Sequence, residues 1–327
     1  MPNQVFQLHP LDENFVGPKP IEVAPVEAIQ ALEAAGHLII ERKRNGHGGL
    51  VSATGLRKRH IELYSRGAHA LTEKFPALVE ELREISIPRD TLLAGEMVVT
   101  VDGGIDAPST FGRFASAKPK RAIELQAQYA SVQLALFNVI VHKGKSVIGL
   151  PYADRLDIIR ELTARHRPVN VDVVAVLNKT FAQAKNFADE LKWEGLVLYD
   201  KRAGSTFRLD GRSDQPPRPD GCWKWKPYLE GDFVATGWIP STSAKFKGLV
   251  KDLLIAQHDL VTHELVSWGK VGIGLSAAER REFADDSLYP MVFEVEFERR
   301  TPKKRLISAK ILRRRTDKTP GECYSPV

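Results

Sequence analysis

The chain has 327 residues, a mass of 36.5 kDa and a formal net charge of +6. A chain of this length is expected to form about two domains. Its composition, with 43% hydrophobic and 27% charged residues, excludes a collagen, a coiled coil or a wholly disordered chain. The two cysteines, Cys222 and Cys323, exclude a disulfide framework and predict a reducing, cytoplasmic compartment. No apolar run approaches about 18 residues, and the first residues lack a signal-peptide pattern.

The first part of the chain mixes strands and helices without a strict alternation, which favours an α+β fold with mainly antiparallel sheets. Expected strands are 37–43, 50–53, 60–64, 92–101, 132–141, 195–199 and 222–226, and expected helices are 26–35, 77–85, 122–129, 152–165 and 181–191. Asn45-Gly46 is a strong hairpin signal, so we expect the first two strands to pair.

The pattern changes after residue 226. Short strands are expected at 233–238, 249–256, 260–268 and 291–297, with a helix at 277–284. This predicts a small Greek-key barrel, for which the OB-fold is the leading candidate. We therefore expect two domains, 1–229 and 230–327.

A basic segment lies near the end of the chain. Between Arg299 and Lys318 there are ten Lys or Arg residues against the single acidic residue Asp317. Such a run is often a solvated face, but apolar residues such as Ile311 interrupt this one and place it in a folded domain. With a pI near 9.2, the segment predicts a polyanionic partner.

Several charged residues stand at unusual places in the expected strands. Lys43 ends an apolar strand before a glycine loop, where an ordinary surface lysine is the simpler interpretation. Glu96 and Glu194 lie in or beside apolar strands, where a carboxylate is costly to bury unless it is paired or bound to a metal. Lys224 and Lys226 alternate with tryptophans, so on a strand they share one face, which a common anion would explain.

These residues together suit a nucleoside triphosphate pocket. Carboxylates hold a divalent cation, cationic side chains bind phosphate, and an aromatic ring such as Phe137 stacks on a base. A lysine amine can attack phosphorus as a covalent nucleophile, provided that it first loses the proton it carries at neutral pH.

The order of the segments resembles the covalent nucleotidyltransferases, which include ATP-dependent DNA ligases, RNA ligases and mRNA capping enzymes. Lys43-Arg44-Asn45-Gly46 matches their Lys-x-Asp/Asn-Gly motif, and the later motifs follow in order as Ser65-Arg66-Gly67, Glu96, Phe137, Glu194-Gly195 and Lys224-Trp225-Lys226. The chain is most similar to ATP-dependent DNA ligases of the minimal viral or bacterial type. Its segment 313–318 is similar to their C-terminal Arg-x-Arg-x-Asp-Lys motif, and the resemblance covers about residues 37–318.

The resemblance implies a nucleotidyltransferase (adenylation) domain followed by an OB-fold barrel, in a monomer that seals nicked duplex DNA, which could contain RNA. It implies ATP as cofactor and Mg²⁺ or Mn²⁺ held by Glu96 and Glu194. Lys43 would be the catalytic nucleophile that carries AMP. The remaining nucleotide-binding residues would be Glu41 at the adenine edge, Phe137 on its face, Arg66 at ribose or phosphate, Lys224 and Lys226 at phosphate, and Arg313, Arg315, Asp317 and Lys318 at pyrophosphate.

Three positions depart from the DNA ligase pattern. Asn45 and Asn138 each replace an aspartate, and Gly48 stands where those enzymes carry an arginine. Two of these departures, Asn45 and Gly48, lie in the loop after Lys43 and favour an RNA ligase or a mixed RNA/DNA ligase as an alternative. A capping guanylyltransferase, which would use GTP, and a non-catalytic nucleic-acid-binding protein are further alternatives.

Overall fold

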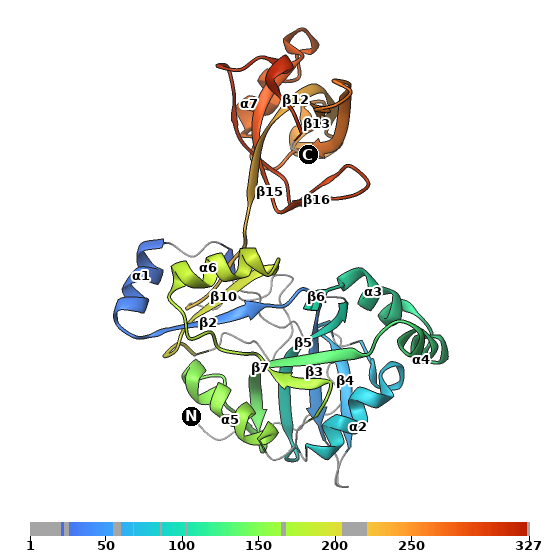
Figure 1. Ribbon diagram of the computed structural model, residues 1–327, viewed down its shortest axis with the longest axis vertical. Helices are drawn as coiled ribbons and strands as arrows, with labels where there is room; N and C mark the ends of the chain where they lie inside the picture. The colour runs from blue at the N-terminus through green and yellow to red at the C-terminus, as the bar shows by residue number, and fades with distance from the viewer. Residues whose placement is uncertain are drawn as a thin grey trace. The chain divides into compact units, whose positions relative to one another are not determined.

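A computed structural model describes residues 21–22, 26–54, 60–67, 69–85, 87–101, 104–164, 168–204 and 221–325. The chain divides into two compact units, 1–225 and 226–327 (Figure 1). The expected boundary between residues 229 and 230 falls at the start of the first strand of the second unit, β12 (Leu229–Pro240). None of the helices in the described ranges is long and apolar enough to cross a membrane.

The described part of the first unit contains two sheets. The smaller has the order β1 (Ile21–Glu22), β11 (Cys222–Trp225), β10 (Gly195–Asp200) and β2 (Leu38–Lys43). The larger has the order β4 (Ile61–Ser65), β3 (His47–Ala53), β5 (Thr91–Val101), β7 (Val132–His142) and β8 (Lys145–Ser146), with β6 (Ile105–Asp106) on β5 and β9 (Val171–Val173) on β7. Only the β1–β11 and β7–β9 pairs of these described strands are parallel, so the expected antiparallel character is confirmed.

Helices cover both sheets (Figure 1). α1 (Val26–Ala34) and α6 (Phe181–Glu190) pack on the smaller sheet, and α5 (Tyr152–Thr163) packs on β7 of the larger one. Around the larger sheet also lie η1 (Thr72–Lys74), α2 (Pro76–Glu84), α3 (Pro108–Ser116) and α4 (Pro119–Gln128). α3 was not predicted, because Ser, Thr and Gly in its sequence favour helices weakly. Burial of Phe111 and Phe114 stabilises it instead.

The expected hairpin at Asn45-Gly46 is wrong. β2 pairs with β10 in the smaller sheet, whereas β3 pairs with β4 and β5 in the larger one. A tight hairpin turn of this sequence needs positive φ angles, and neither Asn45 nor Gly46 has one. The segment between β2 and β3 therefore carries the chain from one sheet to the other.

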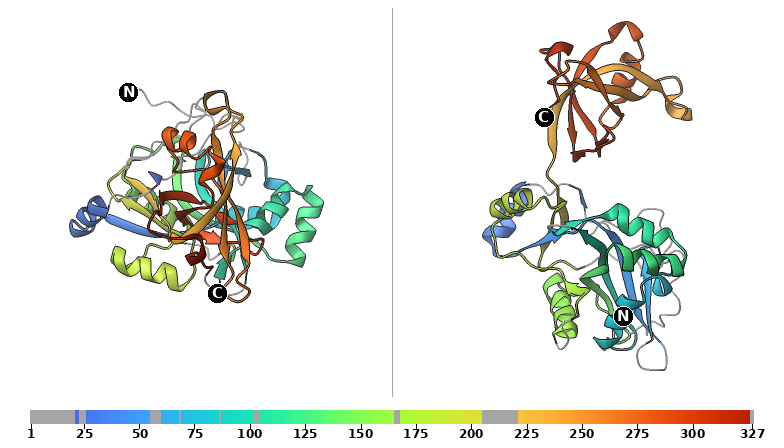
Figure 2. Two further views of the ribbon diagram at one scale, coloured as in Figure 1. Left: turned by 90° about the horizontal axis from the view of Figure 1, so that it is seen from above. Right: turned by 45° about the vertical axis from the view of Figure 1, so that its right-hand side comes forward.

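The second unit is built on a five-stranded antiparallel sheet, which curves strongly (Figure 2). Its order is β14 (Leu265–Val271), β13 (Val250–His258), β12, β15 (Met291–Phe297) and β18 (Lys310–Arg314). The remaining elements are η3 (Ala244–Phe246), α7 (Ala277–Glu282), η4 (Asp286–Leu288), β16 (Arg299–Arg300), β17 (Leu306–Ile307) and η5 (Pro320–Glu322). Ile311 is buried in its core, so the basic segment belongs to the folded unit as predicted.

Candidate active site

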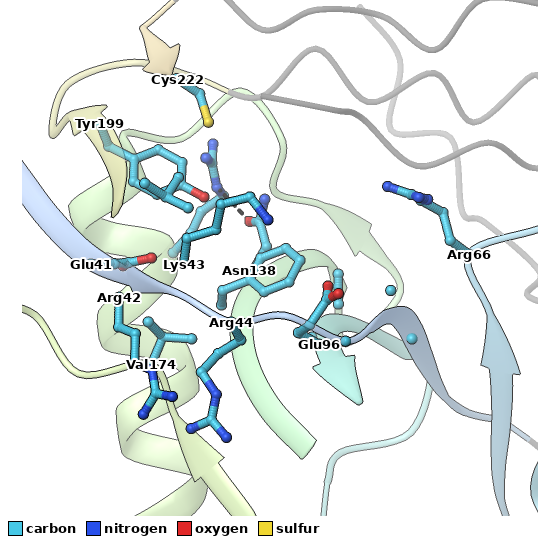
Figure 3. Close-up of a pocket in the computed structure, with 18 of the residues that line it drawn as sticks. Glu41, Arg42, Lys43, Arg44, Arg66, Glu96, Asn138, Val174, Tyr199 and Cys222 are labelled. Atoms are coloured by element: carbon cyan, nitrogen blue, oxygen red, sulfur yellow. Dashed lines mark hydrogen bonds between the residues drawn. The ribbon is translucent and has the colours of Figure 1, made fainter. Parts of the chain in front are cut away.

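A pocket of about 280 Å³ lies between the two sheets of the first unit. Strands β2, β10 and β11 supply one wall, and β3, β5 and β7 supply the other. The structure thus brings together six of the predicted site residues, which are spread over residues 41–194: Glu41, Lys43, Arg66, Glu96, Phe137 and Glu194. Figure 3 labels the first four of them.

Lys43 is the last residue of β2, and strand pairing places Gly195 of β10 opposite it. The preceding residue, Glu194, forms an ion pair with the Lys43 ammonium. Gly195 has a φ of 150°, a conformation that favours glycine, so a side chain here would strain the turn into β10. The Glu-Gly sequence therefore provides both the carboxylate and the backbone that places it beside the lysine.

Glu96 lies in the middle of β5, opposite Gly48 of β3. Burial raises its pKa to about 7, and the neighbouring charge of Glu194 acts in the same direction. The positive charges of Lys43 and Arg66 and a hydrogen bond from the Gly46 backbone oppose this rise. Glu194 and Glu96 line the same pocket, and the charge of Glu194 acts on Glu96. Two carboxylates placed in this way can serve as ligands of a divalent cation.

Glu41 is only 1% exposed, although it contributes to the pocket lining. The buried Tyr152 hydroxyl donates a 2.6 Å hydrogen bond to its Oε1 atom. Burial raises the pKa of Glu41 to about 8, and the Tyr152 hydrogen bond lowers it. The Tyr152 ring stacks on Tyr199 with centroids 3.7 Å apart. The sequence did not identify either tyrosine, although Tyr199 lines the pocket, because a buried tyrosine in a helix or strand looks like any core residue.

Phe137 and Asn138 both line the pocket, although adjacent residues of a regular strand point to opposite faces. The pairing of β5 with β7 shifts at this point, from Ala94 opposite Asn138 to Gly95 opposite Leu136, so Phe137 is the extra residue of a bulge. A β-bulge turns side chains in this way, and bulges are common beside active sites.

Asn138 contacts the buried Arg155 of α5. The guanidinium of Arg155 is 2% exposed and donates to Asn138 Oδ1 at 3.0 Å and to the carbonyls of Ile148 and Leu150 at 3.1 and 2.7 Å. All three acceptors are neutral. Burial lowers the pKa of Arg155, as expected for a cation that lacks a carboxylate partner in the described chain.

The departure at Gly48 has a structural explanation. The Arg66 backbone N–H donates to the Gly48 carbonyl at 2.8 Å, and a Cβ atom at position 48 would lie 3.2 Å from Arg66 Cβ. The lack of a side chain at position 48 therefore gives the stem of Arg66 room at the edge of the pocket.

The two lysines of the Lys-Trp-Lys segment differ from expectation. β11 ends at Trp225, so Lys226 lies one residue beyond the strand, which was expected to reach residue 226. Lys226 belongs to the second unit and pairs with Glu298 there at 2.7 Å. Lys224 is half-buried but is not among the residues that line the pocket. The structure thus gives Lys226 an acidic partner in the second unit, and a common anion for the two lysines stays a prediction.

The predicted residues of the C-terminal motif, Arg313, Arg315, Asp317 and Lys318, all lie in the second unit, where each forms an ion pair. Asp232 accepts from Arg315 at 3.0 Å and from Lys318. Arg315 also pairs with Asp317 at 2.7 Å, and Arg313 pairs with Glu294 at 2.6 Å.

Comparison with known proteins decides the family. The family model described as the ATP dependent DNA ligase domain matches residues 20–215, which is more than half of the chain. The chain belongs to the ATP-dependent DNA ligase family. The family model covers all six residues that meet in the pocket, and the resemblance expected from the motifs is confirmed.

Individual ligases are similar to this family member over different lengths. A DNA ligase from Thermococcus fumicolans is 29% identical over 274 residues, which are 81% of this chain and 45% of that protein. The SPbeta prophage-derived DNA ligase-like protein LigB of Bacillus subtilis is 30% identical over 154 residues, 47% of this chain and 51% of that protein. The chain thus spans about half the length of the curated relatives it matches.

A solved structure also shares the fold. A chain from a structure–function study of Lig E DNA ligases superposes with a TM-score of 0.63 and covers 92% of this chain and 100% of its own length. Its sequence identity is 16%, so this likeness shows a common ligase fold and no more.

Proposed function

We propose that this protein is an ATP-dependent DNA ligase that seals nicks between a 5′-phosphate and a 3′-hydroxyl in duplex DNA. The proposal is carried by Lys43, which ends a strand inside a pocket beside Glu194 and Glu96 in a chain of this family. The side-chain amine of a lysine at this position can attack phosphorus and carry the nucleotide as a covalent intermediate.

The reaction has three displacements at phosphorus. The neutral Lys43 amine attacks the α-phosphate of ATP, forming a P–N bond while the bond to pyrophosphate breaks. An oxygen of the 5′-phosphate then takes the AMP and releases the lysine. Finally the 3′-hydroxyl attacks the activated 5′-phosphate, and AMP leaves. Each step depends mainly on positioning and on charge neutralisation.

Glu96 and Glu194 fit a divalent cation, Mg²⁺ or Mn²⁺. Magnesium usually takes one or two protein carboxylates and completes its shell with phosphate oxygens and water. In the described part of the chain no cluster of three or more His, Cys, Asp or Glu side chains forms a metal cage, which suits a cation that is shared with nucleotide phosphates. Such a cation would neutralise charge on the transferred phosphate.

The other pocket residues suit the nucleotide. Phe137, turned inward by its bulge, would stack on the adenine face, and Glu41 lies where it can meet the adenine edge. Arg66, at the pocket rim, would bind ribose or phosphate. Lys224 and Lys226 remain predicted phosphate ligands.

For the second unit we propose an OB-fold domain that binds the DNA duplex. Its five-stranded curved antiparallel sheet and single helix suit that barrel. The predicted pyrophosphate ligands Arg313, Arg315, Asp317 and Lys318 lie on or just after β18. Binding through a basic segment to phosphates should weaken steeply as salt rises.

The first test is covalent labelling. The protein is incubated with Mg²⁺ and ATP labelled at the α-phosphate, and the labelled protein is resolved on a denaturing gel. We expect label on the wild type and on the matched control Lys120→Ala, which changes an exposed lysine of α4, and none on Lys43→Ala. Label retained by Lys43→Ala would exclude this residue as the nucleophile.

A second candidate, an RNA or mixed RNA/DNA ligase, is favoured by Asn45 and by Gly48, which gives room to Arg66 in place of its own side chain. A panel of nicked duplexes with DNA or RNA on each side of the nick separates the two. Parallel labelling with GTP tests a guanylyltransferase. Preferential sealing of nicks that carry RNA would favour the second candidate over a DNA ligase.

A further inference from the structure

One buried carboxylate contacts the lysine strand on both sides of Lys43. Asp106, the last residue of β6, has a side chain that is 5% exposed. Its Oδ1 atom lies 2.8 Å from Arg44 Nη2 and 3.3 Å from Arg42 Nη2. Its Oδ2 atom accepts from Arg44 Nε at 3.2 Å and from the Asn45 backbone N–H at 2.8 Å. A single side chain thus holds residues 42, 44 and 45.

These contacts determine the direction of Lys43. Arg42 and Lys43 are successive residues of β2 and therefore point to opposite faces, and Arg44, just beyond the end of the strand, contacts the same carboxylate as Arg42. Figure 3 shows this arrangement, with Glu41 and Lys43 extending to one side of β2 and the guanidinium groups of Arg42 and Arg44 to the other. Arg44 Nε donates a hydrogen bond to one carboxylate oxygen, and Arg44 Nη2 makes an ion-pair contact with the other.

The contacts of Asp106 matter because β2 ends at Lys43. The chain leaves the smaller sheet here and enters the larger one at His47, so residues 44–46 belong to neither sheet. Backbone at a strand end loses the ladder that orders it, and the hydrogen bond from Asn45 N–H to Asp106 supplies a substitute.

Asp106 also connects the lysine to the opposite wall. β6 pairs with β5, the strand that carries Glu96, and Asp106 lies opposite Thr100. The Thr100 hydroxyl accepts from Arg44 Nη2 at 3.1 Å, so Arg44 is held by both members of this pair. The β5–β6 hairpin therefore joins the strand of Glu96 to the strand of Lys43 through Thr100 and Asp106, which are not among the residues that line the pocket.

We propose that Asp106 is a positioning residue for the Lys43 nucleophile, acting through Arg42, Arg44 and the Asn45 backbone. It sets the approach of the amine to the α-phosphate and makes no contact with nucleotide. This inference rests on the proposed lysyl-AMP chemistry. It predicts that loss of the carboxylate harms the step in which Lys43 is the attacking group and spares the step in which the 3′-hydroxyl attacks.

The test compares these two steps in the full chain. Asp106→Asn keeps the size of the side chain but removes the charge that holds two guanidinium groups. A displacement of about 1 Å at a reacting atom can cost on the order of 100-fold, so we expect single-turnover adenylation at saturating ATP to slow by about 10- to 100-fold. The KM for ATP in the adenylation step should change little. Sealing of a nick that already carries 5′-AMP, which needs no ATP, should stay within about threefold of wild type.

Asp157→Asn is the matched control, because it removes an exposed carboxylate paired with Arg160 at 3.0 Å. We expect it to behave as wild type in both steps. The inference is overturned if Asp106→Asn adenylates as fast as wild type, or if both steps fall equally together with the melting temperature. A wild type that takes no label would instead refute the lysyl-AMP proposal, so the two failures are distinguishable.

A partner variant covers the case in which Asp106→Asn does not fold. Arg44→Gln removes the two-nitrogen contact from the opposite side of the same ion pair. We expect the same selective loss of adenylation, and a double variant that is no slower than the more impaired single variant. Unchanged adenylation in Arg44→Gln would equally overturn the role of the carboxylate.

Discussion

The buried Glu41 side chain gives the protein a stability that depends on pH. Its carboxyl group is 1% exposed, and its pKa is raised by burial from the ordinary 4.5 to about 8, while the Tyr152 hydrogen bond limits the rise. The folded chain therefore keeps the Glu41 proton at pH values where the unfolded chain has lost it. Since the unfolded state binds fewer protons in this interval, stability falls as the pH rises from about 4.5 to about 8.

The size of the effect follows from that interval. Each pH unit corresponds to about 1.4 kcal/mol, so an interval of about 3.5 units, from 4.5 to about 8, gives a penalty of about 5 kcal/mol above pH 8. At pH 7 the penalty is about 3 kcal/mol. A small domain has a total stability of only about 5 to 15 kcal/mol, so Glu41 should contribute strongly to the pH dependence of the first unit, together with Glu96.

Glu41→Gln isolates this effect. The amide keeps an oxygen that accepts from Tyr152 but cannot ionise. We expect the variant and the wild type to have similar stability near pH 5 and to diverge as the pH rises, with the variant several kcal/mol more stable at pH 8 to 9. A urea titration monitored through hydrogen exchange of the β2 and β10 amides measures the stability of the first unit separately from that of the second.

The control is Glu190→Gln, a change of an exposed glutamate in α6, whose curve should run parallel to that of the wild type. Glu96 also has a raised pKa, but it is present in all three proteins and cancels in their differences. Parallel curves for Glu41→Gln and the wild type would refute the reasoning, because they would show that Glu41 ionises alike in the folded and unfolded chains.

Two further predictions concern the pocket. Burial raises the pKa of Glu96 to about 7, and a carboxylate must be ionised to bind a divalent cation. The adenylation rate at limiting Mg²⁺ should therefore rise through pH 7, and the midpoint of this pH profile should shift to lower pH as the Mg²⁺ concentration increases. A midpoint that does not move with Mg²⁺ would contradict this. Asn138→Asp would give the buried Arg155 a carboxylate partner, and we expect about 1 to 3 kcal/mol more stability in urea unfolding at pH 7. Because Arg155 holds the pKa of the new carboxyl below its usual range, the gain should disappear as the pH falls below about 4; a loss of stability at pH 7 would show that desolvation outweighs the pairing.

The regular elements could be predicted because their apolar residues have clear periods. The strand 132–141 and the helix 181–191 appear within a residue or two of the expected limits, as β7 and α6. The order of the motifs could likewise be recognised, since each motif is a short strand or turn with a charged residue at a fixed place. The pairing of Lys43 with Glu194, 151 residues apart, follows only from strand register.

Other features depend on contacts that no local pattern carries. The bulge that turns Phe137 inward arises from a register shift between β5 and β7, and its residues look like any apolar strand. Asp106 belongs to a two-residue strand, too short to show a period. Lys226 pairs with Glu298, which lies 72 residues away, so the expected sharing of an anion with Lys224 could not be checked from the sequence.

The Lys-Arg-Asn-Gly segment shows why a motif can be recognised for the wrong local reason. Gly46 suggested a turn, yet its φ is not positive. A Cβ atom at this position would lie 2.2 Å from the Met97 carbonyl oxygen and 2.6 Å from a Val98 methyl, so no other residue could pass so close to β5. The glycine is needed because the chain crosses between sheets directly beside the strand of Glu96. That crossing brings a lysine from one sheet against a carboxylate from the other, so the glycine and the chemistry of the site have a common structural cause.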